Sequence, residues 1–318
     1  MSTDFNVNLP LVSIVSPCYN GASYLGRFLD SVLAQTYDNI ELIIINDGST
    51  DQTEEIIRSY ESKFELRGYG FHYMFQENQG PSVAINKGLK VFSGSFLTWP
   101  DSDDVLHPDN ITKKVNFLQT NQQFDMVVCK SRIIDEQTLT VVGSLERNPT
   151  VSDDLFEDLI IERNVYFAPG GYMVRSCAFF VLFPTRSIIE HKAGQNWQIL
   201  LPFAYYKKCG IIDEFLFDYY LRHGSHSRKE ISEFELLTKL SNHESLLLKV
   251  LDYINPVNFE YYRQMIKVKY VRRRLMLFLS HSNYKSAFKE LFLLLKLGKL
   301  TGYDVKKFVR VWITGIFR

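Results

Sequence analysis

Short apolar runs alternate with segments of helical spacing along the first hundred residues. Two runs rich in Ile and Val, residues 11–17 and 41–45, end in turn residues, as buried parallel strands do. Residues 71–75 alternate as a strand does, and the apolar residues 95–99 predict a fourth strand. The segments between them place apolar residues three and four positions apart, which predicts amphipathic helices over residues 23–35, 49–60 and 81–92. Strand, helix, strand units form right-handed crossovers, so the first half is predicted to be an α/β sheet with parallel strands.

After residue 232 the periodicity becomes that of long helices. Five apolar residues share one helical face: Leu236, Leu240, Leu247, Leu251 and Ile254. Turn-forming residues interrupt the pattern at 255–256, 280–283 and 298–302, which predicts four helices joined by short turns. The expected organisation is one domain over residues 1–230, with halves 1–110 and 111–230, followed by a helical, basic module over residues 231–318.

Composition sets bounds on the class of protein. The 318 residues are 46% hydrophobic, which suffices for a full core. The four cysteines lack Cys-x-x-Cys spacing, and no apolar segment of a secretory signal precedes Leu11, so neither a disulfide framework nor secretion is expected. No apolar run approaches the ~18 residues that a membrane-spanning helix needs. These features favour a folded, cytoplasmic protein.

Charge is distributed unevenly, although the net charge is zero. Residues 259–318 hold 14 Lys and Arg against 3 Asp and Glu, whereas the rest of the chain holds 22 against 33. Basic amphipathic helices of this kind lie on anionic membranes, and the alternative is a helical bundle whose lysines are simply solvated. Nucleic acid is not expected as a partner, because no recognised nucleic-acid-binding module accompanies the charge.

Polar residues follow each of the four predicted strands, at positions 17–20, 46–49, 76–80 and 101–104. In an open α/β sheet, ligands bind outside the carboxyl ends of the strands. Each segment alone is also explained as an ordinary turn or helix cap, but four on one edge favour a nucleotide site. The chain has no Gly-x-Gly-x-x-Gly and no Gly-x-x-x-x-Gly-Lys, so a dinucleotide or P-loop site is not supported.

Three carboxylates stand together after the fourth strand, in the sequence Asp101-Ser102-Asp103-Asp104. Carboxylates this close repel one another unless a cation or a set of donors neutralises them. Mg²⁺ and Mn²⁺ favour such oxygen ligands together with substrate phosphates. The pattern therefore indicates a divalent-metal site, with a solvated acidic turn as the alternative.

These segments together resemble the family 2 glycosyltransferases of the GT-A fold, which are inverting enzymes that use nucleotide-activated sugars. The resemblance covers about the first 110 residues, in the family's order and spacing, and is looser beyond Pro108. It is carried by residues 12–20, 31–37, 41–51, 78–88 and 95–108. The resemblance implies a GT-A, Rossmann-like mixed sheet sandwiched by helices, with an α-helical C-terminal appendage. Residues 1–110 would then be the nucleotide-sugar half and 111–230 the acceptor half.

The resemblance also implies a donor site. Pro17 and Tyr19 match the loop that packs on the base and ribose, and Asp47 matches the carboxylate that accepts a hydrogen bond from a uracil imide or its equivalent. The remaining positions expected to bind the nucleotide sugar are Asn20, Asn78, Gly80, Asn86, Asp101 and Ser102. Asp103, with Asp101, matches the metal-binding carboxylates for Mn²⁺ or Mg²⁺, and His223 lies where a loop histidine can add a ligand; its alternative is a plain surface histidine.

The general base is the point at which this chain departs from the family. Members usually supply it from a Glu-Asp pair that opens a later helix, but the matching residues here are Gln195 and Asn196, whose amides cannot act as a base. Three interpretations remain: Glu190 or Asp104 supplies the base, the amide pair orients the acceptor while another group takes the proton, or the protein is not a transferase. The second is favoured, because the other family-like features are intact.

The sequence thus predicts an inverting glycosyltransferase of cell-surface polysaccharide biosynthesis. It would move a sugar from a nucleoside diphosphate sugar, a UDP-sugar first, to a hydroxyl of a saccharide or lipid-linked saccharide, at the cytoplasmic face of the inner membrane. The competing class is a catalytically lapsed module that binds sugar nucleotides or glycans. A nucleotidyltransferase is less favoured, because it would need a Gly-rich loop near residue 20 and only Gly21 and Gly26 stand there.

Overall fold

The chain divides into two compact units. The computed structural model describes residues 9–148, 150–152, 154–165, 168–222 and 232–316. The sheet unit comprises Met1–Leu155 and Asn164–His223, and the helical unit comprises Phe156–Arg163 and Gly224–Arg318.

Four parallel strands form the first half of the sheet unit, as the sequence predicts. They are β1 (Val12–Cys18), β2 (Ile40–Asp47), β3 (Gly70–Gln76) and β4 (Phe96–Thr98), arranged in the order β3-β2-β1-β4. Every residue of β2 is buried, which is typical of a parallel strand covered on both faces. The carboxyl ends of these strands therefore share one edge of the sheet.

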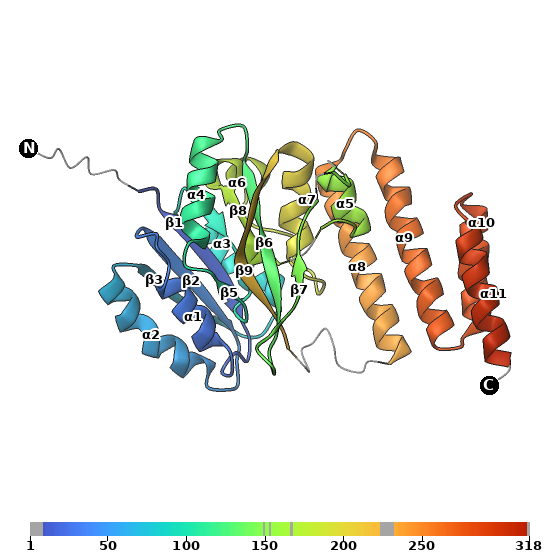
Figure 1. Ribbon diagram of the computed structural model, residues 1–318, viewed down its shortest axis with the longest axis horizontal. Coiled ribbons are helices and arrows are strands. Elements are labelled where there is room, and N and C mark those ends of the chain that lie inside the picture. Colours follow the sequence, from blue (N-terminus) through green and yellow to red (C-terminus); the bar gives the residue numbers. More distant parts are fainter. Residues whose placement is uncertain (1–8, 149, 153, 166–167, 223–231, 317–318) are drawn as a thin grey trace, which may run out of the picture. The chain divides into compact units, whose positions relative to one another are not determined.

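Three helices connect these strands, namely α1 (Leu25–Leu33), α2 (Thr53–Arg67) and α3 (Pro81–Val91). Right-handed crossovers place α1 and α2 side by side on one face and α3 on the other (Figure 1). Helix α3 packs closely on β1 and β2 at Gly88, where a Cβ atom would lie 2.4 Å from a methyl carbon of Val15.

Helix α2 begins later than the sequence predicts, because residues 49–52 serve the neighbouring loop instead. Ser49 Oγ accepts a hydrogen bond from the Asn20 N–H, and Asp51 Oδ2 accepts one from the Ala22 N–H. The helix ends at Gly68, whose φ of 77° is left-handed and favours glycine. The other predicted strands and helices of this half are confirmed within a few residues.

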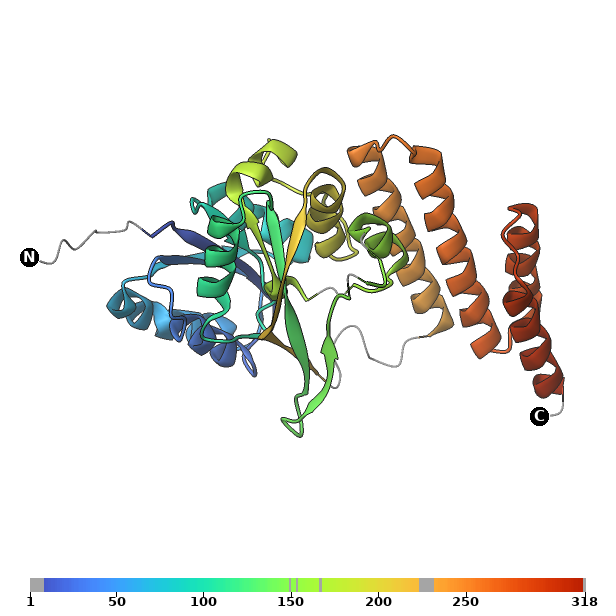
Figure 2. The same cartoon turned by 45° about the horizontal axis from the view of Figure 1, so that its top comes forward.

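The second half makes the sheet mixed. The complete order is β3-β2-β1-β4-β8-β6-β9-β5, with β8 antiparallel to both β4 and β6, and with β7 paired to β6. The turn between β6 and β7 extends beyond the rest of the sheet (Figure 2). The remaining elements of the sheet unit are β5 (Val105–Leu106), α4 (Asn110–Thr120), β6 (Met126–Asp135), β7 (Val141–Leu145), a 3₁₀ turn (Pro169–Gly171), β8 (Tyr172–Arg175), α6 (Ser176–Leu182), α7 (Asn196–Tyr206) and β9 (Cys209–Leu221).

Four helices dominate the helical unit, and all four were predicted. They are α8 (Glu233–Ile254), α9 (Phe259–Ser280), α10 (Tyr284–Lys296) and α11 (Gly302–Ile316), and successive helices lie side by side (Figures 1 and 2). Ser232 and Glu235 form a capping box at the start of α8. In the described part of the chain, no helix is both long and apolar enough to span a membrane.

The helical unit also contains a segment that the sequence analysis assigned to the preceding domain. Helix α5 (Leu155–Ile161) lies across the boundary of the two units, and residues 156–163 belong to the helical one. The Phe156 ring packs edge-on against Tyr262, and Glu162 pairs with Lys269 and Arg273. The two units are therefore not separated by the single boundary after residue 230 that the sequence predicted. The contacts that place residues 156–163 in the helical unit join positions about a hundred residues apart, which local sequence patterns do not report.

Candidate active site

Three carboxylates converge at the carboxyl end of β4. Ligand oxygens of Asp101, Asp103 and Asp104 all lie within 4.8 Å of one another. The Ser16 hydroxyl donates to the Pro100 carbonyl at 2.9 Å, which fastens this turn to the end of β1. The sequence prediction that these three residues form one cluster is confirmed.

Burial and mutual repulsion perturb two of these carboxylates. Burial, together with the charge of Asp103, raises the pKa of Asp101 to about 7. The same two causes raise the pKa of Asp104 well above its ordinary value. Asp104 Oδ1 accepts a hydrogen bond from the Tyr220 N–H at 2.9 Å, whereas its buried Oδ2 has no hydrogen-bond partner in the described structure. The cluster thus combines hard oxygen donors with excess negative charge, a set that fits Mn²⁺ or Mg²⁺.

Two arginines supply positive charge to the cluster. Arg222 follows β9, and its Nε lies 2.9 Å from Asp103 Oδ2, while its guanidinium stacks on the Tyr24 ring at 4.1 Å. Arg27, from α1, donates to the Asp103 carbonyl oxygen at 2.7 Å and stacks over the Tyr220 ring. The sequence analysis connected neither arginine with the cluster, since no local pattern links Arg27 or Arg222 to residue 103. His223 lies outside the described residues.

Asp47 holds the loop that follows β3. Its Oδ1 accepts from Gln76 Nε2 at 2.7 Å and from the Gln79 N–H at 3.0 Å, and its Oδ2 accepts from the Gly80 N–H at 2.9 Å. The Gly80 φ of 92° is left-handed, and Pro81 then opens α3. Asp47 itself is buried, so these three bonds fix the rim segment that contains Asn78 and Gly80.

The loop after β1 is joined to the loop after β2. Asn20 has a φ of 48°, and its Oδ1 accepts from the Thr50 N–H at 2.8 Å. Pro17 pairs in register with Ile45, and the Tyr19 side chain is exposed at this rim. Ser102 is buried and hydrogen bonds to the Cys18 thiol. The expected donor-binding residues of the first, second and fourth strand ends are therefore brought to one edge of the sheet.

Asn86 has a different place, facing a later segment of the chain. Its Nδ2 donates to the Ile188 carbonyl at 2.9 Å, and its Oδ1 accepts from the Ile188 N–H at 2.8 Å. Ser82, one turn earlier on α3, makes the same pair of bonds with the backbone of His191. Both polar ends of the buried Asn86 amide are therefore engaged, and α3 anchors the segment that leads to Gln195.

That segment delivers an amide to the acidic cluster. Gln195 Nε2 donates to Asp101 Oδ1 at 3.2 Å, and Asn196 begins α7. Asn196 Oδ1 and both amide atoms of the nearly inaccessible Gln198 are buried without a hydrogen-bond partner among the described residues. Glu190 is exposed on the anchored segment. The sequence analysis missed Gln198, although an amide directly before the apolar run of residues 199–203 was a signal.

Taken together, the mixed sheet and its helices define an α/β protein with the GT-A fold, whose polar edge gathers the candidate site residues. The model for the family described as Glycosyl transferase family 2 matches residues 13–182, more than half of the chain. The chain belongs to this family.

Curated relatives and solved structures agree with this assignment. An uncharacterised glycosyltransferase of Rickettsia prowazekii is 42% identical over 134 residues, which are 42% of this chain and 40% of the relative. One of Rickettsia typhi is 33% identical over 213 residues, 66% of this chain and 56% of the relative. The matches thus span about half the length of these relatives.

Among solved structures, the Staphylococcus aureus protein TarS, residues 1–349 in complex with UDP-GlcNAc, superposes with a TM-score of 0.62 at 17% identity, over 95% of this chain and 89% of that one. The mannosyltransferase PcManGT of Pyrobaculum calidifontis, in complex with GDP-Man and Mn²⁺, superposes with a TM-score of 0.56 at 12% identity, over 96% and 87% of the two chains. At these identities the likeness establishes the shared fold.

Proposed function

We propose that this chain is an inverting glycosyltransferase that moves a sugar from a nucleoside diphosphate sugar, first a UDP-sugar, to a saccharide or lipid-linked saccharide hydroxyl. The observation that carries the proposal is the carboxylate cluster of Asp101, Asp103 and Asp104 at the edge where nucleotides bind to α/β sheets. We further propose that the reaction belongs to cell-surface polysaccharide biosynthesis at the cytoplasmic face of the inner membrane.

Asp103 and Asp101 are the residues that would hold Mn²⁺ or Mg²⁺, with His223 as a further ligand. When bound there, such an ion neutralises the charge that develops on the departing diphosphate. The Mn²⁺ in the PcManGT complex supports this assignment by analogy of fold. Arg222, which already pairs with Asp103, is a second source of positive charge for the diphosphate.

Donor recognition is assigned to the joined loops. The exposed Tyr19 ring offers a face on which a base can stack, with Pro17 two positions earlier, near the end of β1. Asp47 keeps the 76–80 loop in place and, as a carboxylate with about four acceptor sites, retains capacity for one more donor such as an imide N–H. The proposed donor rim is completed by Asn20, Asn78, Gly80 and Ser102. Asn86 supports it indirectly, because its amide anchors the backbone of Ile188.

The acceptor side is assigned to the start of α7. Asn196 and Gln198 hold three buried polar atoms without hydrogen-bond partners among the residues that the structure describes, and a saccharide hydroxyl both donates and accepts. Of the two candidate bases, Asp104 is completely inaccessible, whereas Glu190 is exposed on a segment anchored to α3. We therefore assign proton removal to Glu190 and acceptor orientation to Gln195 and Asn196.

A catalytically lapsed binding module is the second candidate. The observation that favours it is the amide pair Gln195 and Asn196 where the family usually has carboxylates. In that case the cluster and the joined loops would bind a sugar nucleotide without cleaving it.

Release of free nucleoside diphosphate distinguishes the two candidates. We expect metal-dependent release from one sugar nucleotide of a panel, stimulated by a lipid-linked saccharide extract, and we expect Glu190→Gln to lower kcat at least tenfold while the donor Kd stays unchanged. Glu65→Gln, at an exposed position of α2, is the matched control. Donor binding with no release under any condition would favour the lapsed module, and an unchanged kcat in Glu190→Gln would refute the assignment of the base.

A further inference from the structure

The hairpin of α10 and α11 exposes a row of large apolar side chains. On each helix these residues recur at spacings of three or four, and they are Phe288, Phe292 and Leu295 on α10, and Val305, Val309 and Trp312 on α11. Phe288 is 59% exposed and Trp312 is 46% exposed. We name these six residues the apolar stripe.

The stripe is distinct from the side of the hairpin that packs into the core. Ala287 and Leu294 of α10 are buried in the core of the helical unit, and Phe308 and Val311 of α11 pack against it. At 100° per residue, the stripe lies about a quarter turn away from these core positions on both helices. The Phe288 and Phe308 rings are 6.2 Å apart, so the stripe of α10 borders α11.

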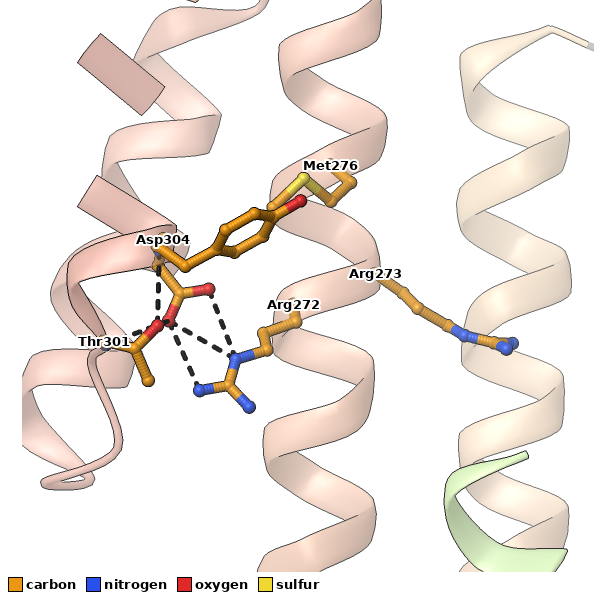
Figure 3. Close-up of a pocket in the computed structure, with 6 residues that line it drawn as sticks. Arg272, Arg273, Met276, Thr301 and Asp304 are labelled. Atoms are coloured by element: carbon orange, nitrogen blue, oxygen red, sulfur yellow. Dashed lines mark hydrogen bonds and ion pairs between the residues drawn. The ribbon is translucent and has the colours of Figure 1, made fainter. Parts of the chain in front are cut away.

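The acidic residues of the hairpin are turned inward and neutralised. Asp304 is buried, and its carboxylate accepts hydrogen bonds from Arg272 of α9 and from the Thr301 hydroxyl (Figure 3). Glu290 pairs with Arg274 of α9 at 3.3 Å. Figure 3 also shows Arg273 extending from the other side of α9, away from Asp304.

The lysines of the hairpin, in contrast, have no carboxylate partners in the described part of the chain. They are Lys285, Lys289, Lys296, Lys299, Lys306 and Lys307. On α10, the first three lie next to the stripe by the same helical geometry, on its solvent side. The hairpin therefore presents large apolar side chains bordered by uncompensated positive charge.

We propose that this face binds the surface of an anionic lipid bilayer, with the stripe at the boundary of headgroups and acyl chains and the lysines on lipid phosphates. A helix face with aromatic and aliphatic residues bordered by Lys and Arg is suited to this position. Charge complementarity also selects the partner, because a second copy on the same face would bring lysines against lysines. The inference does not depend on the proposed transferase reaction.

Vesicle binding by the full chain, without donor or acceptor, tests the proposal. We expect co-sedimentation with phosphatidylcholine vesicles that contain 30% phosphatidylglycerol, weakened by salt and at least tenfold weaker with phosphatidylcholine alone. Trp312 is the exposed tryptophan, since Trp99 and Trp197 are buried, so its fluorescence should shift to the blue and be quenched by brominated lipids.

Matched variants separate insertion from general charge. Replacing Lys285, Lys289 and Lys296 with Gln, or Phe288 and Phe292 with Ser, should each weaken binding at least tenfold. Replacing the exposed Lys63, Lys90 and Lys208 of the sheet unit with Gln changes the net charge equally and should leave binding within about twofold. Circular dichroism confirms that each variant is folded.

Three results would overturn the proposal. One is the absence of binding to anionic vesicles, and another is an equal loss of binding in the sheet-unit control. The third is a concentration-dependent oligomer that Phe288→Ser and Phe292→Ser dissolve while vesicle binding is absent, which would assign the stripe to a second copy. Because nucleotide release is measured separately, failure here leaves the proposed transferase reaction intact.

Discussion

The sheet unit and the helical unit use charge in opposite ways. In the sheet unit, three carboxylates lie within 4.8 Å of one another, and one buried carboxylate oxygen of Asp104 has no partner among the described residues. In the α10–α11 hairpin of the helical unit, Asp304 and Glu290 are each neutralised by an arginine, and the hairpin's lysines have no carboxylate partner among the described residues. The first arrangement suits the cation that we propose for it, and the second suits the anionic surface that we propose for it.

The two units also differ in how their functional groups are brought together. The contacts of the acidic cluster join distant positions: Arg222 reaches Asp103 and Gln195 reaches Asp101. The apolar stripe arises within single helices, from residues three or four positions apart. A site of the first kind depends on the whole sheet, whereas a surface of the second kind depends on helical periodicity.

The largest effect is expected from a substitution in the proposed cation site of the sheet unit, which does not alter the helical unit. Asp103→Asn should abolish metal-dependent donor binding, with nucleoside diphosphate release falling at least about a hundredfold, or ~2.7 kcal/mol of transition-state stabilisation. Mn²⁺-dependent donor binding, measured by calorimetry, checks this prediction.

The control for Asp103→Asn is Asp38→Asn, at a mostly exposed carboxylate in the loop between α1 and β2. Vesicle binding should be the same in both variants. Unchanged Mn²⁺-dependent affinity in Asp103→Asn would contradict the metal assignment.

Much of this contrast could be predicted from sequence, because hydrophobic periodicity reports burial. The parallel strands and the four C-terminal helices follow directly from spacings of apolar residues. Helix α2 began later than predicted, since Ser49 and Asp51 hydrogen bond to a loop some thirty residues away. The sequence also did not reveal that residues 156–163 belong to the helical unit, because this rests on ion pairs between Glu162 and α9.

The site could be predicted only where residues are neighbours in sequence. The three carboxylates stand within four positions, so their cluster was foreseeable. Arg27 was not, because its contact with Asp103 spans 76 positions. Asn86 lies within one of the family-like motifs, residues 78–88. Both ends of its amide nevertheless hydrogen bond to the backbone of Ile188, a partner that only the folded chain reveals.

A smaller effect is expected when the positive charge of Arg222 is removed from the acidic cluster of the sheet unit. The Arg222 guanidinium pairs with the Asp103 carboxylate that would bind metal, so it competes with a divalent ion. Arg222→Gln should raise the affinity for Mn²⁺ without donor about tenfold, or ~1.4 kcal/mol, while slowing donor cleavage. Electron paramagnetic resonance of free Mn²⁺ measures this affinity directly.

Arg58→Gln removes the same charge from an exposed pair on α2 and should leave Mn²⁺ affinity unchanged. Weaker Mn²⁺ binding in Arg222→Gln would show that Arg222 supports the metal site instead of competing for it.

The smallest expected effect is on the pH dependence of stability, to which one buried lysine in each unit contributes. Burial lowers the pKa of Lys114 and of Lys269 to about 8, but the two lysines have different partners. Lys269 pairs with Glu162, whereas Lys114 donates, among the described residues, only to the neutral oxygens of Asn110 and Gly170. Below pH 8 both lysines are protonated in the folded and unfolded states alike. Between pH 8 and the unfolded pKa near 10.5, the unfolded chain binds more protons, so stability should rise with pH.

For Lys114 the gain from pH 8 to pH 9 is about 1 kcal/mol by proton linkage. Urea unfolding should therefore show that Lys114→Met loses this increment relative to the parent protein, while Lys113→Met, at the partly exposed neighbouring position, keeps it. Cysteine and tyrosine ionisation cancels in the difference between variants. An increment that persists in Lys114→Met would mean that the Lys114 amine reaches solvent. The contrast between Lys114, a buried lysine bonded to neutral oxygens, and Lys269, a buried lysine paired with Glu162, would then be weaker than the structure indicates.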